Sequence, residues 1–153
     1  MEKKRGGGDE IPPVTMDACA SGWFRCRVGL WHTTIYLFVG EWSDMLRTGR
    51  VRFKDRPDML EGIAEFATGT DAANVWFVDK TNAIIRMQKF RPCWLDDQLS
   101  LSHECLHAAQ HILHNVHAEV DPAGSETLAY THEFIVGKLT HEILKKMGRK
   151  KSK

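Results

Sequence analysis

Two kinds of hydrophobic periodicity run along the chain, and the first is typical of β-strands. Residues 23–28 half-alternate between apolar and polar side chains, and residues 33–39 are rich in β-branched and aromatic types. The second run is apolar on both faces, which predicts a strand covered by helices on at least one side. Residues 75–78 and 83–90 are two further apolar runs, and the polar turn 79–82 between them predicts a β-hairpin.

Apolar residues at helical spacing predict a pair of helices between these groups of strands. Residues 42–50 predict a short helix capped by Ser43, after which residues 51–53 look extended. Residues 57–67 predict a second helix, because Pro57 suits a first helical turn. The apolar stripe of this second helix comprises Leu60, Ile63, Ala64 and Ala67.

Two longer helices are predicted in the C-terminal half of the chain. The first covers about residues 98–117 and is capped by Asp96 or Asp97. After a loop at residues 121–124, a last helix covers about residues 125–147. The apolar surface of the first is supplied by Leu99, Leu106, Ala109, Ile112, Leu113 and Val116. Strands that precede a pair of long helices indicate an α+β fold.

Length and composition indicate a single globular domain. The 153 residues suit one hydrophobic core, and 42% hydrophobic with 27% charged residues is typical of a soluble protein. We expect the domain to cover residues 14–148, between a disordered Gly-rich tail at residues 1–13 and a basic tail at residues 149–153. No apolar run approaches the roughly 20 residues of a membrane span, so no membrane partner is expected.

The N-terminal segment and the cysteines indicate a reducing compartment. Residues 1–13 contain no apolar core of a secretory signal peptide, so we expect a cytoplasmic protein. The four cysteines form no C-x-x-C pair, which predicts free thiols, and Cys105 should pack into the core. The formal net charge of +1 gives no general reason to expect nucleic-acid binding.

Residues 103–107 form an H-E-x-x-H sequence inside the helix predicted at residues 98–117. His103 and His107 lie four residues apart, so their imidazoles project from one helical face and could bind one Zn²⁺. Glu104 is rotated by about 100° from His103, where it could hold a metal-bound water and act as its general base. The same five letters also occur by chance in unrelated helices, so other residues must decide whether the site exists.

A catalytic zinc site needs a third protein ligand and leaves one position for water. The pattern with a distant third histidine fails, because Gln110 and Leu113 occupy its glycine and histidine positions. A carboxylate from the last helix is the alternative, and we predict Glu126, which opens that helix. Glu133, two turns further along nearly the same face, is the main rival, and Glu119 on the loop and Glu142 near the end of the helix are the others.

Other polar side chains accompany the predicted ligands. Tyr130 lies one turn after Glu126, where its phenol could stabilise an oxyanion during catalysis, hydrogen-bond a ligand, or pack between helices. His111, His114 and His117 fall within the same arc of about 120° as the motif histidines. They could bind extra metal, but we expect them to line an exposed helix face beyond the cleft.

Two segments resemble a known family. Residues 101–109 carry the H-E-x-x-H motif, and residues 125–130 carry E-x-x-A-Y at the start of a long amphipathic helix. Together with the preceding hairpin, they resemble the small zincin-like metallopeptidases encoded by tailed bacteriophages and prophages. The resemblance covers about residues 75–145 and is less specific over residues 1–70. It implies a small mixed sheet packed on the H-E-x-x-H helix and on a long helix that supplies a glutamate ligand.

The resemblance also implies roles for the site residues. His103, His107 and Glu126 would bind Zn²⁺, and Glu104 would be the catalytic base. The expected function is therefore a zinc-dependent hydrolase acting on a peptide or protein substrate, in the host cytoplasm if the chain is phage-encoded. Two alternatives stay open, namely a catalytically inactive metal-binding structural or interaction protein of phage origin, and nucleic-acid contact through the two basic tails. The sequence gives neither the substrate's identity nor the oligomeric state.

Overall fold

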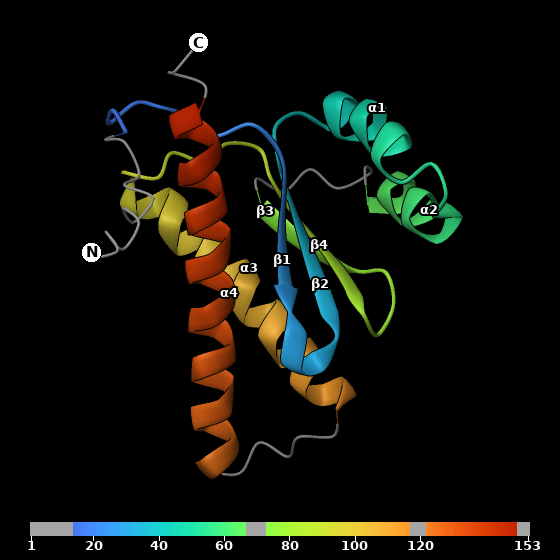
Figure 1. Cartoon of the computed structure of the whole chain (residues 1–153), viewed down its shortest axis with the longest axis vertical. Helices are drawn as coiled ribbons and strands as arrows, with labels where there is room; N and C mark the ends of the chain where they lie inside the picture. The colour runs from blue at the N-terminus through green and yellow to red at the C-terminus, as the bar shows by residue number, and fades with distance from the viewer. Residues whose placement is uncertain (1–13, 67–72, 117–121, 150–153) are drawn as a thin grey trace, which may run out of the picture.

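The computed structural model describes residues 14–66, 73–116 and 122–149, which contain four strands and four α-helices (Figure 1). The elements of the first half are β1 (Gly22–Val28), β2 (Thr33–Val39), α1 (Trp42–Arg52) and α2 (Pro57–Phe66). Those of the second half are β3 (Ala73–Phe77), β4 (Asn82–Met87), α3 (Leu95–Asn115) and α4 (Pro122–Arg149). A 3-10 turn, η1 (Gly29–Trp31), joins β1 to β2. The α+β class is confirmed, and the predicted tail at residues 1–13 lies outside the described residues.

The four strands form one mixed sheet in the order β1-β2-β4-β3, so β1 and β3 are its two edges. Both edge strands run antiparallel to their neighbours, whereas the central strands β2 and β4 are parallel. The predicted hairpin is confirmed as β3 and β4. Asp79 stabilises its turn, because the carboxylate accepts hydrogen bonds from the backbone N–H of Thr81 (2.6 Å) and the side-chain amide of Asn82 (3.0 Å).

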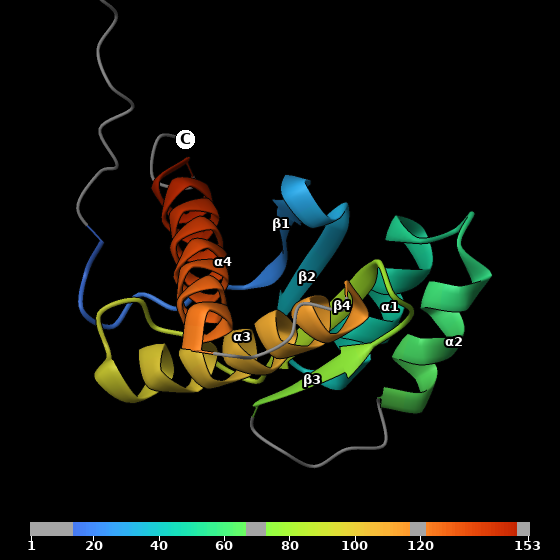
Figure 2. The same cartoon turned by 90° about the horizontal axis from the view of Figure 1, so that it is seen from below.

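Helices cover both faces of the sheet (Figures 1 and 2). α3 and α4 pack on the face to which β2 turns Ile35, Leu37 and Val39. α1 and α2 pack on the other face, around Phe38 and Ile84. The run predicted to be covered on at least one side is therefore buried on both, which explains why its hydrophobic pattern does not alternate.

α1 is longer than the local pattern predicts. Val51 and Arg52 continue the helix instead of forming an extended segment, and its N-cap is Glu41 rather than Ser43. Phe53 follows as the C-cap and is buried among the aromatic residues beneath α1. Its ring contacts those of Trp23 and Tyr36, at centroid distances of 5.3 and 5.0 Å, so the residue at the helix end packs against partners that lie far away in the sequence.

α2 turns a different stripe toward the sheet from the one predicted. Ile63 is buried as expected, but Ala64 is exposed, and Ala67 lies outside the described residues. Gly62 instead faces Trp76 of β3, so closely that a Cβ atom at this position would overlap the indole ring. The glycine therefore allows α2 and the edge strand β3 to approach each other.

α3 begins at Leu95, with Trp94 as its N-cap, so the prediction of an aspartate cap is wrong. Asp97 is engaged elsewhere, because its carboxylate accepts the backbone N–H of Arg91 (2.7 Å) and two guanidinium N–H groups (2.8 and 3.0 Å). These hydrogen bonds hold the pKa of the Asp97 carboxyl below its ordinary value. Leu99, predicted to supply apolar surface, is 58% exposed.

The two buried cysteines lie inside the larger core. Cys105, on the inner face of α3, is fully buried as predicted, and burial raises the pKa of its thiol well above the ordinary value. Burial also raises the pKa of Cys26 on β1 to about 11. All four cysteines are free, in agreement with the expectation from the sequence. Neither buried thiol is therefore ionised at neutral pH.

α4 begins at Pro122, so the predicted loop at residues 121–124 is helical from that proline onward. Proline suits a first helical turn because its missing N–H has no partner there. The buried residues Ile135, Leu139 and Ile143 recur every four positions and join the core between α4 and the sheet. In the described part of the chain, no helix is both long and apolar enough to cross a membrane.

Candidate active-site cleft

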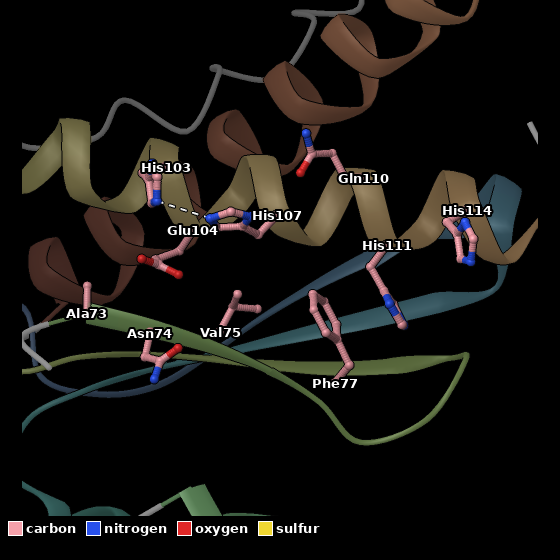
Figure 3. Close-up of a pocket in the computed structure, with 10 residues that line it drawn as sticks. All are labelled: Ala73, Asn74, Val75, Phe77, His103, Glu104, His107, Gln110, His111 and His114. Atoms are coloured by element: carbon pink, nitrogen blue, oxygen red, sulfur yellow. Dashed lines mark hydrogen bonds between the residues drawn. The ribbon is translucent and has the colours of Figure 1, made fainter. Parts of the chain in front are cut away.

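A cleft of about 640 Å³ runs between α3 and the edge strand β3 (Figure 3). The α3 residues that line it are His103, Glu104, His107, Gln110, His111 and His114. The β3 residues that line it are Ala73, Asn74, Val75 and Phe77. The H-E-x-x-H motif therefore opens onto the free edge of the sheet.

The two motif histidines converge within this cleft. Both are exposed, and Nε2 of His103 lies 3.0 Å from Nε2 of His107, with the rings nearly perpendicular at 87°. Two nitrogens bound to one tetrahedral zinc ion at about 2.0–2.1 Å lie about 3.3 Å apart. The four-residue helical spacing thus places both ring nitrogens where a single cation could contact them.

Glu104 lines the same cleft more deeply than the two histidines. It is only 8% exposed, and Figure 3 shows its carboxylate on the side of α3 that faces β3. The difference from His103 follows from the rotation of about 100° between successive helical residues. A carboxylate in this position can take a proton from a water held at the histidine pair.

β3 presents its free backbone edge to the cleft. The backbone N–H of Val78 donates to the carbonyl of Asn82 (3.0 Å), so the backbone of Val78 faces β4. Successive residues of an antiparallel pair alternate between facing the partner strand and facing away from it. Ala73, Val75 and Phe77 therefore direct their N–H and C=O groups away from β4. Since these three residues also line the cleft, an extended chain could pair with the strand there.

His111 and His114 line the cleft rather than a face beyond it, so the expectation for them is wrong. The ring of His111 stacks on Phe77 with 3.8 Å between centroids, and its Nε2 accepts a hydrogen bond from the amide of Asn115 (2.7 Å). These contacts fix His111 between α3 and β3, where it narrows one end of the cleft. His117 lies outside the described residues.

The residues predicted on α4 do not meet the histidine pair. Glu126 and Tyr130 are exposed, and neither is among the described residues that line the cleft. At 100° per residue, Glu126 and its rival Glu133 project roughly 140–160° away from the buried Thr131. Tyr130 lines a separate hollow against η1, and Glu119 lies outside the described residues.

α4 instead contacts the motif helix through His132, to which sequence analysis gave no role. Nε2 of His132 lies 3.0 Å from both the hydroxyl and the carbonyl oxygen of Ser102, the residue before His103. The amphipathic pattern could have indicated this position, since His132 follows Leu128 by four residues and precedes Ile135 by three. The contact fixes how α4 crosses α3 beside the motif.

The described residues therefore hold part of the predicted ligand set. His103 and His107 are together, but within these residues no three His, Cys, Asp or Glu side chains are grouped so as to hold a metal ion. Comparison with protein-family models, with curated proteins and with solved structures finds no match to this chain.

Proposed function

We propose that the chain is a zinc-dependent hydrolase of zincin-like fold that cleaves peptide bonds in an extended segment of a peptide or protein. The proposal is carried by the convergence of His103 and His107, whose Nε2 atoms lie 3.0 Å apart in a cleft that also holds Glu104. Neutral imidazoles are common zinc ligands, and a carboxylate beside them is the usual general base of a zinc hydrolase. A cytoplasmic location and a phage origin belong to the same proposal.

Bound zinc would supply a Lewis acid for the scissile carbonyl and would lower the pKa of a bound water. The chain's own chemical contribution is the carboxylate of Glu104. This group accepts the proton of the attacking water and then delivers it to the amine that leaves, so the carboxylate is regenerated in each cycle. Because Glu104 is 8% exposed, little bulk water competes for that proton.

β3 would align the substrate along the cleft. An extended peptide can add to the outward N–H and C=O groups of Ala73, Val75 and Phe77, as in other cases of strand addition. β3 carries no charged side chain, so covering this edge buries no charge. The peptide backbone would then lie opposite Glu104 and the histidine pair on α3.

The third zinc ligand in this proposal is Glu126, with Glu133 as the alternative. Because both carboxylates are exposed on α4 and lie outside the cleft, α4 would have to rotate or shift against α3 for either to reach zinc at the histidine pair. The two carboxylates lie seven residues apart on one face of α4, and α4 contacts the motif helix at Ser102 through His132. Substitution by alanine and elemental analysis separate the two candidates. The ligand's variant should lose bound zinc, whereas the other variant should keep the wild-type content.

The proposal is tested by measuring bound zinc and peptide hydrolysis in the same protein samples, with fluorescent casein as substrate. Glu104→Gln should lower the turnover rate about 10²- to 10⁴-fold, the usual contribution of a general base, without changing the zinc content. His103→Ala should lose both zinc and turnover. His141→Ala is the matched control, since His141 is exposed on α4 and does not line the cleft.

Two outcomes would decide against a zinc peptidase. Turnover that survives in Glu104→Gln would contradict the role given to this carboxylate. A wild type that binds zinc, cleaves no peptide and loses much of its thermal stability on chelation would favour the alternative, a metal-stabilised structural or interaction protein.

A further inference from the structure

The opposite edge of the sheet forms a second hollow, which we call the basic hollow. It measures about 630 Å³ and lies between β1, the end of α1 and the C-terminal half of α4. Its basic residues are Arg25, Arg27, Arg52, Lys138, Lys145, Lys146 and Arg149. Among the described residues that line it, Glu142 carries the only carboxylate. One third of the chain's 21 lysine and arginine residues therefore meet in one place.

These cations come from elements that are far apart in the sequence. Arg25 and Arg27 alternate on the exposed face of β1. Lys138, Lys145 and Arg149 follow one face of α4 at spacings of seven and four residues. Charged side chains on a solvated helix face or a protected strand edge are common. Here, however, a strand and two helices direct them toward a single concave surface.

Arg52, at the end of α1, is held against aromatic rings. Its guanidinium carbon lies 5.6 Å from the ring centroid of Tyr36 and 5.9 Å from that of Trp23. Burial, with a smaller contribution from nearby Arg25, lowers the pKa of Arg52. An anion bound between Arg25 and Arg52 would relieve the repulsion between these two cations.

The backbone of β1 adds hydrogen-bond donors to the same surface. Thr34 of β2 donates its N–H to the carbonyl of Thr81, at the β4 side of the sheet. The backbone of Thr34 thus points away from β1, so Arg27, which lies opposite Thr34, forms no backbone hydrogen bond with it and directs its own N–H away from the sheet. Arg25 lies two residues earlier on β1 and points in the same direction, because backbone groups alternate along a strand. The free edge of β1 therefore faces outward beside the arginine side chains.

Lys146 already occupies the outward carbonyls at the start of β1. Its Nζ donates to the carbonyl oxygens of Ser21 (3.2 Å) and Trp23 (3.4 Å) and lies 4.6 Å from the ring centroid of Phe24. A peptide strand that paired with β1 would have to displace Lys146. The basic hollow thus mainly offers donors and positive charge, which suit a ligand that accepts hydrogen bonds and is anionic.

We infer that the basic hollow binds the phosphate backbone of a nucleic acid. Phosphate oxygens accept hydrogen bonds and carry one negative charge per nucleotide, and arginine contacts them with two parallel N–H groups. The exposure of Arg25, Arg27 and Lys138 suits a polymer that passes across the surface. Trp23 is partly buried, with 5.0 Å between its ring centroid and that of Phe38. Because this indole is packed against the protein, it is not placed to stack on a base. We therefore expect contacts to the phosphate backbone of the nucleic acid and little dependence of affinity on base sequence.

Fluorescence anisotropy of labelled DNA of about 20 nucleotides, single-stranded and duplex, tests this inference over a range of salt concentrations. Each phosphate contact contributes about tenfold in affinity at about 0.1 M salt, so Arg25→Ala/Arg27→Ala should weaken duplex binding about 100-fold and reduce the salt slope by about 2. Lys138→Ala/Lys145→Ala, on the opposite wall, should have a similar effect. Lys80→Ala/Lys89→Ala removes two exposed cations outside the hollow and should change affinity less than about twofold.

Four results would overturn the inference. The first is the absence of saturable DNA binding by the wild type at low salt, and the second is an equal loss of affinity in the hollow and control variants. In the third, polyglutamate of matched charge displaces the DNA, which would assign the hollow to an acidic protein segment. In the fourth, vesicles containing phosphatidylserine compete better than DNA, which would assign it to a membrane surface. The result does not depend on the peptidase proposal, because none of these variants alters the cleft.

Discussion

β1 and β3, the two edges of one sheet, combine the same backbone geometry with different side-chain chemistry. Each strand directs the N–H and C=O groups of alternate residues away from the sheet. On β1 two of these residues are Arg25 and Arg27, whereas β3 carries no charge from Ala73 to Phe77. Charges on an edge discourage pairing with another strand, and a neutral edge permits it. Side chains, not topology, thus underlie the different partners proposed for the two edges.

The same contrast concerns the distribution of charge, which a net charge does not describe. A net charge of +1 gave no general reason to expect nucleic-acid binding. Within the described part of the chain, folding nevertheless gathers seven cations and one carboxylate beside β1, whereas the residues that line the β3 cleft there include Glu104 and no lysine or arginine. A sum over the chain cannot reveal this separation, because the cations come from β1, α1 and α4.

The largest structural effect is expected at Gly62, whose replacement should damage the β3 edge and leave the β1 edge intact. A Cβ atom in Gly62→Ala would overlap the indole of Trp76 on β3. We expect a loss of about 1–3 kcal/mol in the free energy of unfolding, as for other overpacked sites. Displacement of β3 should also lower peptide hydrolysis, while DNA binding stays unchanged. Chemical denaturation and the two activity assays measure these effects.

Gly49→Ala is the matched control in α1. Its Cβ atom would lie 3.0 Å from Cδ1 of Ile63, a methyl group at the end of a flexible side chain. The gain in helix propensity of about 1 kcal/mol should offset this tighter contact. If both glycine variants lost the same stability, the close approach of α2 to Trp76 would not be what constrains the β3 edge.

The hydrogen bonds between Arg91 and Asp97, in the first turn of α3, should make a smaller contribution to stability, and this contribution should depend on pH. The Arg91 hydrogen bonds hold the pKa of Asp97 below its ordinary value, so this interaction stabilises the folded state above the unfolded pKa of about 3.9. The contribution is lost as the pH falls through the lower, folded-state pKa. At neutral pH, Asp97→Asn should lower the melting temperature by about 2–4 °C.

A pH series of melting temperatures checks the sign of this prediction. The gap between wild type and Asp97→Asn should be constant at neutral pH. It should begin to narrow below about pH 4, where the carboxylate of the unfolded wild type becomes protonated, and should be lost as the pH falls through the lower pKa of the folded state. A gap that widens in acid would mean that Asp97 is not stabilised as an anion. DNA binding at neutral pH should be equal in the two proteins, since Asp97 does not line the basic hollow.

The smallest effect concerns a single backbone N–H group on the β3 edge. Val75→Pro removes an N–H that points away from β4, so no hydrogen bond within the sheet is lost. If substrate pairs with this group, kcat/KM should fall about fivefold, the equivalent of one hydrogen bond of about 1 kcal/mol. Val75→Ala keeps the N–H and is the control. Equal values of kcat/KM for the two variants would exclude pairing at Val75.

Local patterns predicted the strands and the long helices because their hydrophobic periods are set by the residues themselves. The hairpin at Asp79 and the buried position of Cys105 are confirmed on this basis. Helix ends were predicted less well. Asp97 is predicted to cap α3 but binds Arg91 instead, and Phe53, the C-cap of α1, packs against aromatic residues far away in the sequence. The partners of Phe53 lie outside any short window of sequence, whereas Arg91 lies only six residues before Asp97, and there the apolar pattern does not show which of two local partners the carboxylate takes.

The sequence by itself determined the relation among His103, Glu104 and His107, since helical geometry fixes the rotation between residues of one turn. Only the tertiary structure decided what surrounds them. The crossing of α3 and α4, held at His132 and Ser102, leaves Glu126 exposed and away from the cleft. The placement of β3 and the gathering of cations beside β1 likewise depend on the packing of whole elements. These arrangements join residues far apart in the chain, so no local spacing could specify them.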